Sequence, residues 1–251
     1  MRMVRVFLRT VPIVLLLVGC ATTPPAKQTE LAATRYDLGV AYFDAGHFRR
    51  AVPEFAKAVE LSPSDPVYHT ALGMALMFTK NLDQAIKEFE AAIQADARFS
   101  EAKNNLASAY MLKGDLEKAR ALLVQVLDDP FYPTPQFAYF NLARIYERQG
   151  KVNRAIAEYR RALDITRDYV EAHNNLGFLY LQQSKTDLAI KEFSEATHLS
   201  PKVAIYQRNL GAAYYQAGNR GKARKAFEKV VELEPDSPSA EYARKMLEQL
   251  K

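Results

Sequence analysis

A short motif recurs six times along the chain at an almost constant spacing. Each copy has a leucine, then a small residue, and three positions later a tyrosine in five of the six copies. The small residues are Gly39, Gly73, Ala107, Ala143, Gly177 and Gly211, which lie 34, 34, 36, 34 and 34 residues apart. A period of this length indicates a stack of similar units, because one unit alone is too small to bury its apolar face.

The second half of each unit carries a matching pattern. Twelve residues after the small residue lies an alanine, and four residues further lies a large apolar side chain. These large side chains are Phe55, Phe89, Leu123, Tyr159, Phe193 and Phe227. The whole pattern resembles the tetratricopeptide repeat, whose units are pairs of antiparallel helices. The resemblance implies an all-α fold, a right-handed superhelical solenoid of six tetratricopeptide helix pairs.

Six units and one terminal helix account for most of the chain. The units cover residues 32–65, 66–99, 100–133, 136–169, 170–203 and 204–237, so the repeats together span 32–237. Ser237 and Pro238 form a typical helix start, and an apolar stripe follows them. We expect residues 238–251 to be a capping helix that covers the last repeat.

The first residues are typical of a targeting signal. A basic stretch ends at Arg9, an apolar stretch covers residues 11–18, and Gly19 precedes Cys20. The apolar stretch is too short for a membrane-spanning helix, which needs about 20 residues, so the pattern predicts a signal peptide at 1–19. The segment Leu17–Cys20 resembles the bacterial lipobox, which implies that Cys20 is acylated. The alternative is an ordinary signal peptide with an incidental cysteine.

Residues 20–31 are expected to be a flexible tether, because they contain Pro24 and Pro25 and have no apolar period. Many Gram-negative inner-membrane lipoproteins carry aspartate after the acylated cysteine, whereas this chain has Ala21. The resemblance therefore implies an outer-membrane anchor that faces the periplasm. The net charge of +5 falls to +2 without the three arginines of the signal peptide. The charge therefore gives no reason to expect a nucleic-acid partner.

The chain offers little for catalysis or for metal binding. Its four histidines, His47, His69, His173 and His198, do not have the spacing of metal ligands. The only cysteine is the one expected to be acylated, so no thiol nucleophile remains. We expect a protein that is not an enzyme, holds no cofactor or metal, and acts through its surface.

In tetratricopeptide arrays the inner face is lined by the first helix of each pair. One recurring position of that face holds Asn105, Asn141, Asn175 and Asn209. An amide offers one acceptor and two donor hydrogens, which suits the backbone of an extended peptide. The row resembles the asparagine ladder of peptide-binding arrays. The alternative is that these asparagines bond to neighbouring helices within the array.

The same face is rich in large apolar side chains. They are Tyr36, Phe43, Met74, Met77, Phe78, Met111, Leu112, Phe137, Phe140, Phe178, Leu181 and Tyr215. Each repeat already supplies its own packing residues, so we expect many of these to be exposed. Exposed apolar patches beyond a few hundred Å² usually mark binding sites, and methionine adapts to partners of different shape. The sequence thus predicts an apolar groove for a protein partner, centred on repeats two to four.

The period lengthens to 36 residues between the third and fourth repeats. Three prolines within residues 128–135 keep this insertion out of a helix. Phe131 and Tyr132 either cover the widened joint or contact a partner.

The lipobox, the tether, the six repeats and the Phe-Tyr-Pro insertion together resemble the PilF/PilW pilotin family of type IV pilus lipoproteins. The resemblance implies an outer-membrane lipoprotein that helps to localise or assemble the secretin through which the pilus leaves. The array would bind a secretin subunit while the acyl chains hold the complex at the membrane. Two other functions stay open. One is a general periplasmic adaptor that recruits proteases or cell-wall enzymes, and the other is an outer-membrane protein assembly factor.

Overall fold

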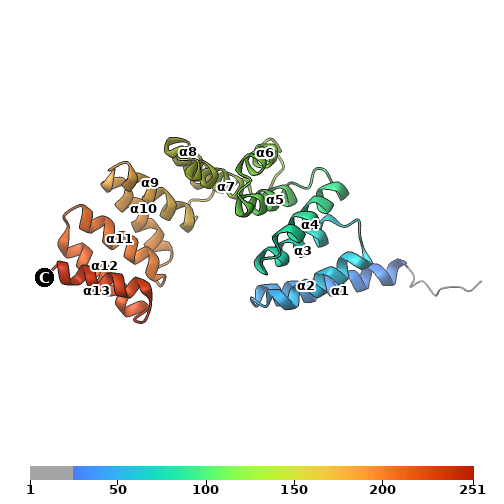
Figure 1. Cartoon of the computed structure of the whole chain (residues 1–251), viewed down its shortest axis with the longest axis horizontal. Helices are drawn as coiled ribbons and strands as arrows, with labels where there is room; N and C mark the ends of the chain where they lie inside the picture. Colours follow the sequence, from blue (N-terminus) through green and yellow to red (C-terminus); the bar gives the residue numbers. More distant parts are fainter. Residues whose placement is uncertain (1–24) are drawn as a thin grey trace, which may run out of the picture.

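The computed structural model describes residues 25–251, and this part of the chain consists of thirteen α-helices joined by short connections. They are α1 (Pro25–Asp44), α2 (Phe48–Leu61), α3 (Pro66–Phe78), α4 (Leu82–Ala95), α5 (Ser100–Lys113), α6 (Leu116–Leu127), α7 (Pro135–Arg148), α8 (Val152–Ile165), α9 (Val170–Gln182), α10 (Thr186–Leu199), α11 (Ala204–Gln216), α12 (Arg220–Leu233) and α13 (Pro238–Gln249). The first twelve form six antiparallel pairs, and α13 follows the last pair (Figure 1). The expected all-α solenoid is confirmed.

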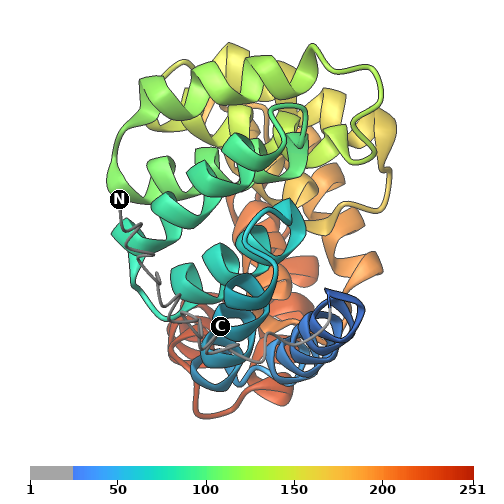
Figure 2. The ribbon, with the colours of Figure 1, turned by 90° about the vertical axis from the view of Figure 1, so that its right-hand side faces the viewer.

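The pairs stack side by side into an open arch with α1 near one end and α13 at the other (Figure 1). Figure 2 shows the same stack turned by 90°, where the successive pairs wind into a superhelix. First helices of neighbouring pairs contact one another, as α1 does α3, α3 does α5 and α5 does α7. These contacts place the first helices on the inner side of the curve. At the top of the arch, α6 and α8 lie outside α5 and α7 (Figure 1).

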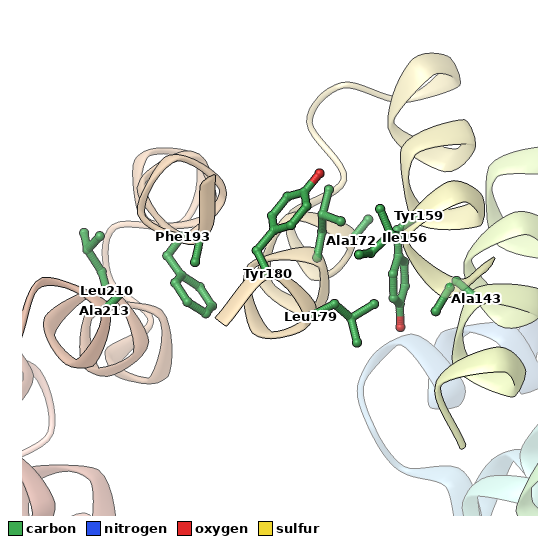
Figure 3. Packing of buried hydrophobic residues seen from close by; sticks show 12 residues of the cluster. Ala143, Ile156, Tyr159, Ala172, Leu179, Tyr180, Phe193, Leu210 and Ala213 are labelled. Atoms are coloured by element: carbon green, nitrogen blue, oxygen red, sulfur yellow. The ribbon is translucent and has the colours of Figure 1, made fainter. Parts of the chain in front are cut away.

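The buried side chains form a row of clusters along the stack instead of one central core. In one cluster, Leu179 and Tyr180 of α9 lie between Tyr159 of α8 and Phe193 of α10 (Figure 3). Each cluster thus combines side chains from neighbouring pairs. A pair is therefore stabilised mainly by the pairs on either side of it.

The small residue of the motif is needed because the two helices of a pair approach each other closely. A Cβ atom on Gly73 would lie 2.6 Å from the Phe89 ring, and one on Gly177 would lie 2.7 Å from the Phe193 ring. Such distances are shorter than van der Waals contact, so the glycine leaves the space that the phenylalanine ring fills. In the third pair the motif has Ala107, and the facing side chain is the smaller Leu123.

The turn within a pair needs one residue in the left-handed region of backbone conformation. At four turns this residue is glycine, namely Gly46 (φ 75°), Gly114 (φ 94°), Gly150 (φ 69°) and Gly218 (φ 74°). At the other two it is Lys80 (φ 67°) or Ser184 (φ 57°). A side chain at such a φ costs roughly 1–2 kcal/mol. The second and fifth pairs therefore hold a strained residue at a turn where the others have glycine.

The first helix begins earlier than expected. α1 starts at Pro25, so residues 25–31 are helical and not part of a flexible tether. Proline is favoured in the first turn of a helix, and Lys27, Gln28 and Glu30 are good helix formers, which explains the extension. Cys20, the signal peptide at 1–19 and the start of the tether lie outside the described residues. Within residues 25–251, no helix combines the length and the apolar character that crossing a membrane requires.

The insertion between α6 and α7 directs its two aromatic side chains to different environments. Tyr132 is buried with 6% exposure in the core cluster of this joint, whereas Phe131 is 90% exposed. The Ser100 hydroxyl donates a hydrogen bond of 2.6 Å to the Asp129 carboxylate, which ties the insertion to the start of α5. Tyr132 therefore covers the joint, and Phe131 projects into solvent.

The terminal helix closes the last pair with both apolar and polar contacts. Ala243, Met246 and Leu250 are buried against the α12 side of the stack. The Arg220 guanidinium donates to the Gln249 carbonyl at 3.0 Å, and the Arg224 guanidinium donates to the Leu250 carbonyl. These two basic side chains thus satisfy carbonyl groups at the C-terminal end of α13.

Candidate partner-binding surface

The apolar residues predicted for the inner face differ in how far they are exposed. Phe78 is 52% exposed, Phe137 42%, and Phe178 and Tyr215 are each 38% exposed. These four side chains come from α3, α7, α9 and α11, and Leu112 on α5 is also exposed. The exposed apolar surface therefore extends along most of the array, beyond the expected centre at repeats two to four.

Other members of the predicted set belong to the core. The expectation that Met111 lines the surface is wrong, because it is only 2% exposed and packs in the cluster that contains Leu123 and Ile145. The reason is that α7 covers this end of α5, as the bond from the Arg148 guanidinium to the Met111 carbonyl shows. Six further members are partly buried against core clusters, namely Tyr36, Phe43, Met74, Met77, Phe140 and Leu181.

Phe78 is part of an aromatic cluster at the turn of the first pair. Its ring stacks on Phe48 with 4.4 Å between centroids, and Phe43 meets both rings edge-on at 5.3 Å and 5.0 Å. A cavity of about 520 Å³ beside Phe48 and Phe78 is also lined by Arg49, Arg50, Lys80 and His47, with no carboxylate among its lining residues. Sequence reasoning missed Phe48, because it begins a second helix and reaches Phe78 only through the stacking of the pairs.

A second aromatic group lies on α7. The Phe137 ring meets Tyr169 edge-on at 5.7 Å, and the Phe140 ring lies 4.8 Å from Tyr169. Burial and the Glu171 charge raise the pKa of Tyr169, and the Arg144 guanidinium partly opposes the rise. Tyr169 thus remains a neutral phenol at physiological pH, and its ring packs against the exposed Phe137.

The asparagine row mostly joins neighbouring first helices. Asn141 is 8% exposed, and its side-chain nitrogen donates to the side-chain oxygen Oδ1 of Asn104 at 3.2 Å and to the Ser108 hydroxyl at 3.1 Å. Asn209 is 4% exposed and donates to Asn174 at 2.8 Å. These two residues follow the alternative interpretation, in which asparagine bonds to the adjacent helix.

The other two members of the row are more accessible. Asn175 is half-buried and donates to the Tyr159 hydroxyl at 3.0 Å. Asn105 is also half-buried, and its side chain makes no hydrogen bond within residues 25–251. The structure therefore leaves Asn105 and Asn175, and not all four asparagines, in reach of a peptide.

A polar cavity of about 430 Å³ lies between α7 and α9. Its lining residues are Arg144, Glu147, Arg148, Asn175 and Gln182. The Tyr159 hydroxyl donates to the Glu147 carboxylate at 2.9 Å. Burial and the Glu147 charge raise the pKa of Tyr159, so its hydroxyl keeps the proton that makes this bond. The sequence analysis predicted an apolar groove on the inner face and did not predict these charged residues.

Two histidines have a structural role that the sequence analysis overlooked. His69 and His173 each follow the start of their unit by three residues, a shared register that could have revealed it. The Nδ1 atom of His173 lies 2.7 Å from the Glu192 carboxylate, and Nε2 lies 2.8 Å from the Arg167 carbonyl. His69 lies in the same way against Glu88 and the Pro63 carbonyl. Among the described residues, no three His, Cys, Asp or Glu side chains group closely enough for a metal ion.

Both ring nitrogens of His173 face oxygen acceptors, which favours the doubly protonated ring. Burial by itself lowers the pKa of His173. Hydrogen bonds to Glu192 and to the Arg167 carbonyl, together with the Glu192 charge, outweigh burial and raise the pKa. His173 thus joins α9 to Glu192 of α10 and to the connection that precedes α9.

Family sequence models match most of the array. A model described as tetratricopeptide repeat matches residues 36–98 and 174–238, a second matches 76–130, and a TPR repeat model matches 143–184. Among curated proteins, the chain is 32% identical over 103 residues to a TPR repeat-containing thioredoxin, TTL4, of Arabidopsis thaliana, which is 41% of this chain and 15% of that protein. It is 25% identical over 159 residues to the type IV pilus assembly protein PilF of Pseudomonas aeruginosa, covering 61% of this chain and 63% of PilF. The chain thus spans less than two thirds of either relative.

Solved structures show the same fold over a longer part of the chain. The Pseudomonas aeruginosa PilF structure superposes with a TM-score of 0.75 at 19% identity and covers 87% of this chain and 99% of the PilF chain. The structure of PilW, described as a type IV pilus biogenesis factor, gives a TM-score of 0.77 at 18% identity, covering 86% of this chain and 99% of PilW. The solenoid is therefore shared with both proteins over nearly the full length of their structures.

Proposed function

Because the chain belongs to the tetratricopeptide repeat family, we propose that it is an outer-membrane-anchored periplasmic scaffold whose protein partner is the secretin subunit of a type IV pilus. The observation that carries this proposal is the combined similarity to PilF, in sequence over 159 residues and in fold over 99% of the PilF structure. Fold similarity alone is common among tetratricopeptide proteins. The sequence match to TTL4 covers only 15% of that protein, whereas the match to PilF covers 63% of PilF.

The surface is suited to a scaffold and not to a reaction. Phe78, Phe137, Phe178 and Tyr215 are exposed on first helices, where a bound segment can contact several of them at once. Aromatic side chains of this kind carry much of the binding energy in protein interfaces. An extended or helical segment of the secretin subunit, laid along the inner face, would bury them.

The anchor in this proposal is the acylated Cys20. The lipobox-like segment Leu17–Cys20 and the alanine at position 21 support it. α1 begins at Pro25, only five residues after Cys20. The first pair would therefore lie close to the membrane surface, with the remaining pairs extending from it.

The deciding experiment compares the secretin in cells with and without this protein. If the scaffold assists assembly, its deletion moves the secretin on a gel from the slowly migrating multimer to the monomer. Restoring the full-length gene returns the multimer. An unchanged secretin pattern after deletion would refute the proposed role.

Co-purification from detergent extracts identifies the partner directly. We expect the tagged full-length protein to retain the secretin subunit. Retention of cell-wall hydrolases or proteases without secretin would mean a general periplasmic adaptor. Retention of barrel-assembly subunits would mean an outer-membrane protein assembly factor. Either result contradicts the proposal.

A further inference from the structure

The cavity between α7 and α9 holds more positive than negative charge. Two guanidinium groups, Arg144 and Arg148, line it together with a single carboxylate, Glu147. That carboxylate already accepts a hydrogen bond of 2.9 Å from the Tyr159 hydroxyl. Its lining residues thus leave a positive charge without an internal counterpart.

Arg144 is the guanidinium that lacks an ionic or hydrogen-bonding partner among the described residues. Its guanidinium lies 5.9 Å from the centroid of the Phe140 ring and makes no hydrogen bond or ion pair within residues 25–251. Three other arginines of the array pair with carboxylates: Arg35 with Glu54, Arg120 with Glu117, and Arg161 with Glu158. The aromatic ring orients the Arg144 guanidinium and leaves its N–H groups available.

The position of Arg144 in its repeat is also unusual. It directly follows the small residue of the motif, a place on the inner face that in the other repeats is uncharged. The corresponding residues are Val40, Met74, Ser108, Phe178 and Ala212. Arg144 is therefore the one charged residue in a row that runs along the whole described array.

The neighbouring side chains add hydrogen-bonding and apolar contacts. Asn175, Phe178 and Gln182 are spaced three and four residues apart, so they share one face of α9. Gln182 is exposed, and its amide makes no hydrogen bond within the described part of the chain. Phe178 is 38% exposed and offers an apolar contact next to the polar cavity.

We propose that this cavity binds the carboxylate of a glutamate or aspartate side chain in an extended peptide of the partner protein, with an apolar residue of the same peptide against Phe178. A planar guanidinium binds a carboxylate through two parallel hydrogen bonds, and Arg144 is free to make them. The Gln182 amide supplies a further donor. The inference rests on the proposed function only in that the peptide comes from the protein partner.

The test measures peptide binding by fluorescence anisotropy with the purified full chain in detergent. The probe is a fluorescein-labelled peptide, Gly-Phe-Glu-Gly-Phe-Glu, and its matched control replaces both glutamates with glutamine. We expect Arg144→Gln to raise the Kd for the glutamate peptide about tenfold or more, because a charge-assisted hydrogen bond is lost. The glutamine peptide should bind the unaltered protein equally weakly.

Arg154→Gln is the matched protein control, because Arg154 is an exposed arginine of α8 outside this cavity. Its substitution removes the same charge and should leave the Kd unchanged. Equal binding of the two peptides, an unchanged Kd in Arg144→Gln, or no binding of the glutamate peptide would each overturn the inference. If the secretin still co-purifies in that case, the proposed function stands without this site. If the peptide depends on Arg144 but secretin is not retained, the site stands and the partner is another acidic protein.

Discussion

Individual side chains of the first helices divide into those that bond one helix to the next and those that remain accessible. Asn141 and Asn209 belong to the first kind, since their amides are buried and bonded to the preceding pair. Phe78 and Arg144 belong to the second kind. This division decides which substitutions should change stability and which should change binding.

Asn141→Ala should lower the free energy of unfolding by about 1–3 kcal/mol, because it leaves Asn104 and Ser108 without their shared donor in a buried place. Urea unfolding followed by circular dichroism measures the change. Asn105→Ala is the control and should cost less than about 0.5 kcal/mol, because the Asn105 side chain makes no hydrogen bond within residues 25–251. Equal losses in the two variants would contradict a structural role for Asn141.

Phe78→Glu should weaken secretin retention without unfolding the array. The side chain is 52% exposed, so about half of it is open to a partner, and the other half packs on Phe48 and Phe43. Loss of an aromatic interface residue costs about 2 kcal/mol, or roughly 30-fold in Kd. The control is Leu188→Glu on α10, which is 40% exposed on a second helix. Equal retention by the Phe78 and Leu188 variants would speak against the inner face as the binding surface.

The His173 interaction predicts a dependence of stability on pH. The folded-state pKa of His173 is raised above the ordinary value of 6.5. The protonated ring therefore adds stability that is fully present below that ordinary value and is lost as the pH rises through the folded-state pKa. Glu192 and Glu195 of α10 are the charges that face the ring.

Urea midpoints of the unaltered protein and of His173→Gln test this expectation. The difference between the two should shrink as the pH is raised from about 6 to about 8. His198→Gln is the control, since His198 is exposed and has no ion pair in the described part of the chain. A difference that stays constant or grows with pH would exclude a protonated His173 as its source.

At the scale of helices, the paired elements follow directly from residue spacing. A contact between a small residue of the first helix and a large ring of the second, such as Gly73 with Phe89, recurs along the array. This contact fixes where the two helices of a pair touch, so the pairs could be predicted from the sequence. The extension of α1 to Pro25 could not be predicted, because proline is common both in tethers and at helix starts. The Phe48 contact and the Arg144 cavity depend on how one pair is rotated against the next, which a repeat pattern does not specify. Met111 was misplaced for the same reason, since α7 covers it.

Gly73→Ala should destabilise the array by about 1–3 kcal/mol, because the new Cβ would lie 2.6 Å from the Phe89 ring and force the two helices apart. Thermal unfolding measures the loss. Gly221→Ala is the matched control in α12, where nothing lies within 4 Å of an added Cβ. It should be neutral or should stabilise the protein by up to about 1 kcal/mol through helix propensity. The packing argument fails if both alanine variants are equally stable.

At the scale of the whole molecule, the array is a curved body with its first pair next to the proposed anchor. The length of the array is set by the number of repeats. This number could be read from the sequence, because each repeat carries its own copy of the motif. The partner could not be derived in the same way, since many adaptors share these repeat positions. The proposed membrane attachment would depend on Cys20, which lies outside the described part of the chain, and is therefore tested in cells.

Cys20→Ser should release the protein from the outer-membrane fraction into the soluble periplasmic fraction. Each buried CH₂ of an acyl chain contributes about 0.8 kcal/mol to membrane binding, and the substitution removes all of them. Fractionation and immunoblotting measure the distribution. Thr22→Ala, two residues further, keeps the cysteine and should leave the protein in the membrane fraction. A Cys20→Ser protein that stays with the outer membrane would rule out the lipid anchor.

Every extensive helix–helix contact in residues 25–251 joins helices that are one or two apart in the sequence. None of these extensive contacts in the described chain spans the arch, so small rotations at successive joints add up along the stack. We therefore expect the two ends of the array to separate or approach while every core cluster stays packed. Tension applied through a bound partner should then extend the array before any helix separates from its neighbour.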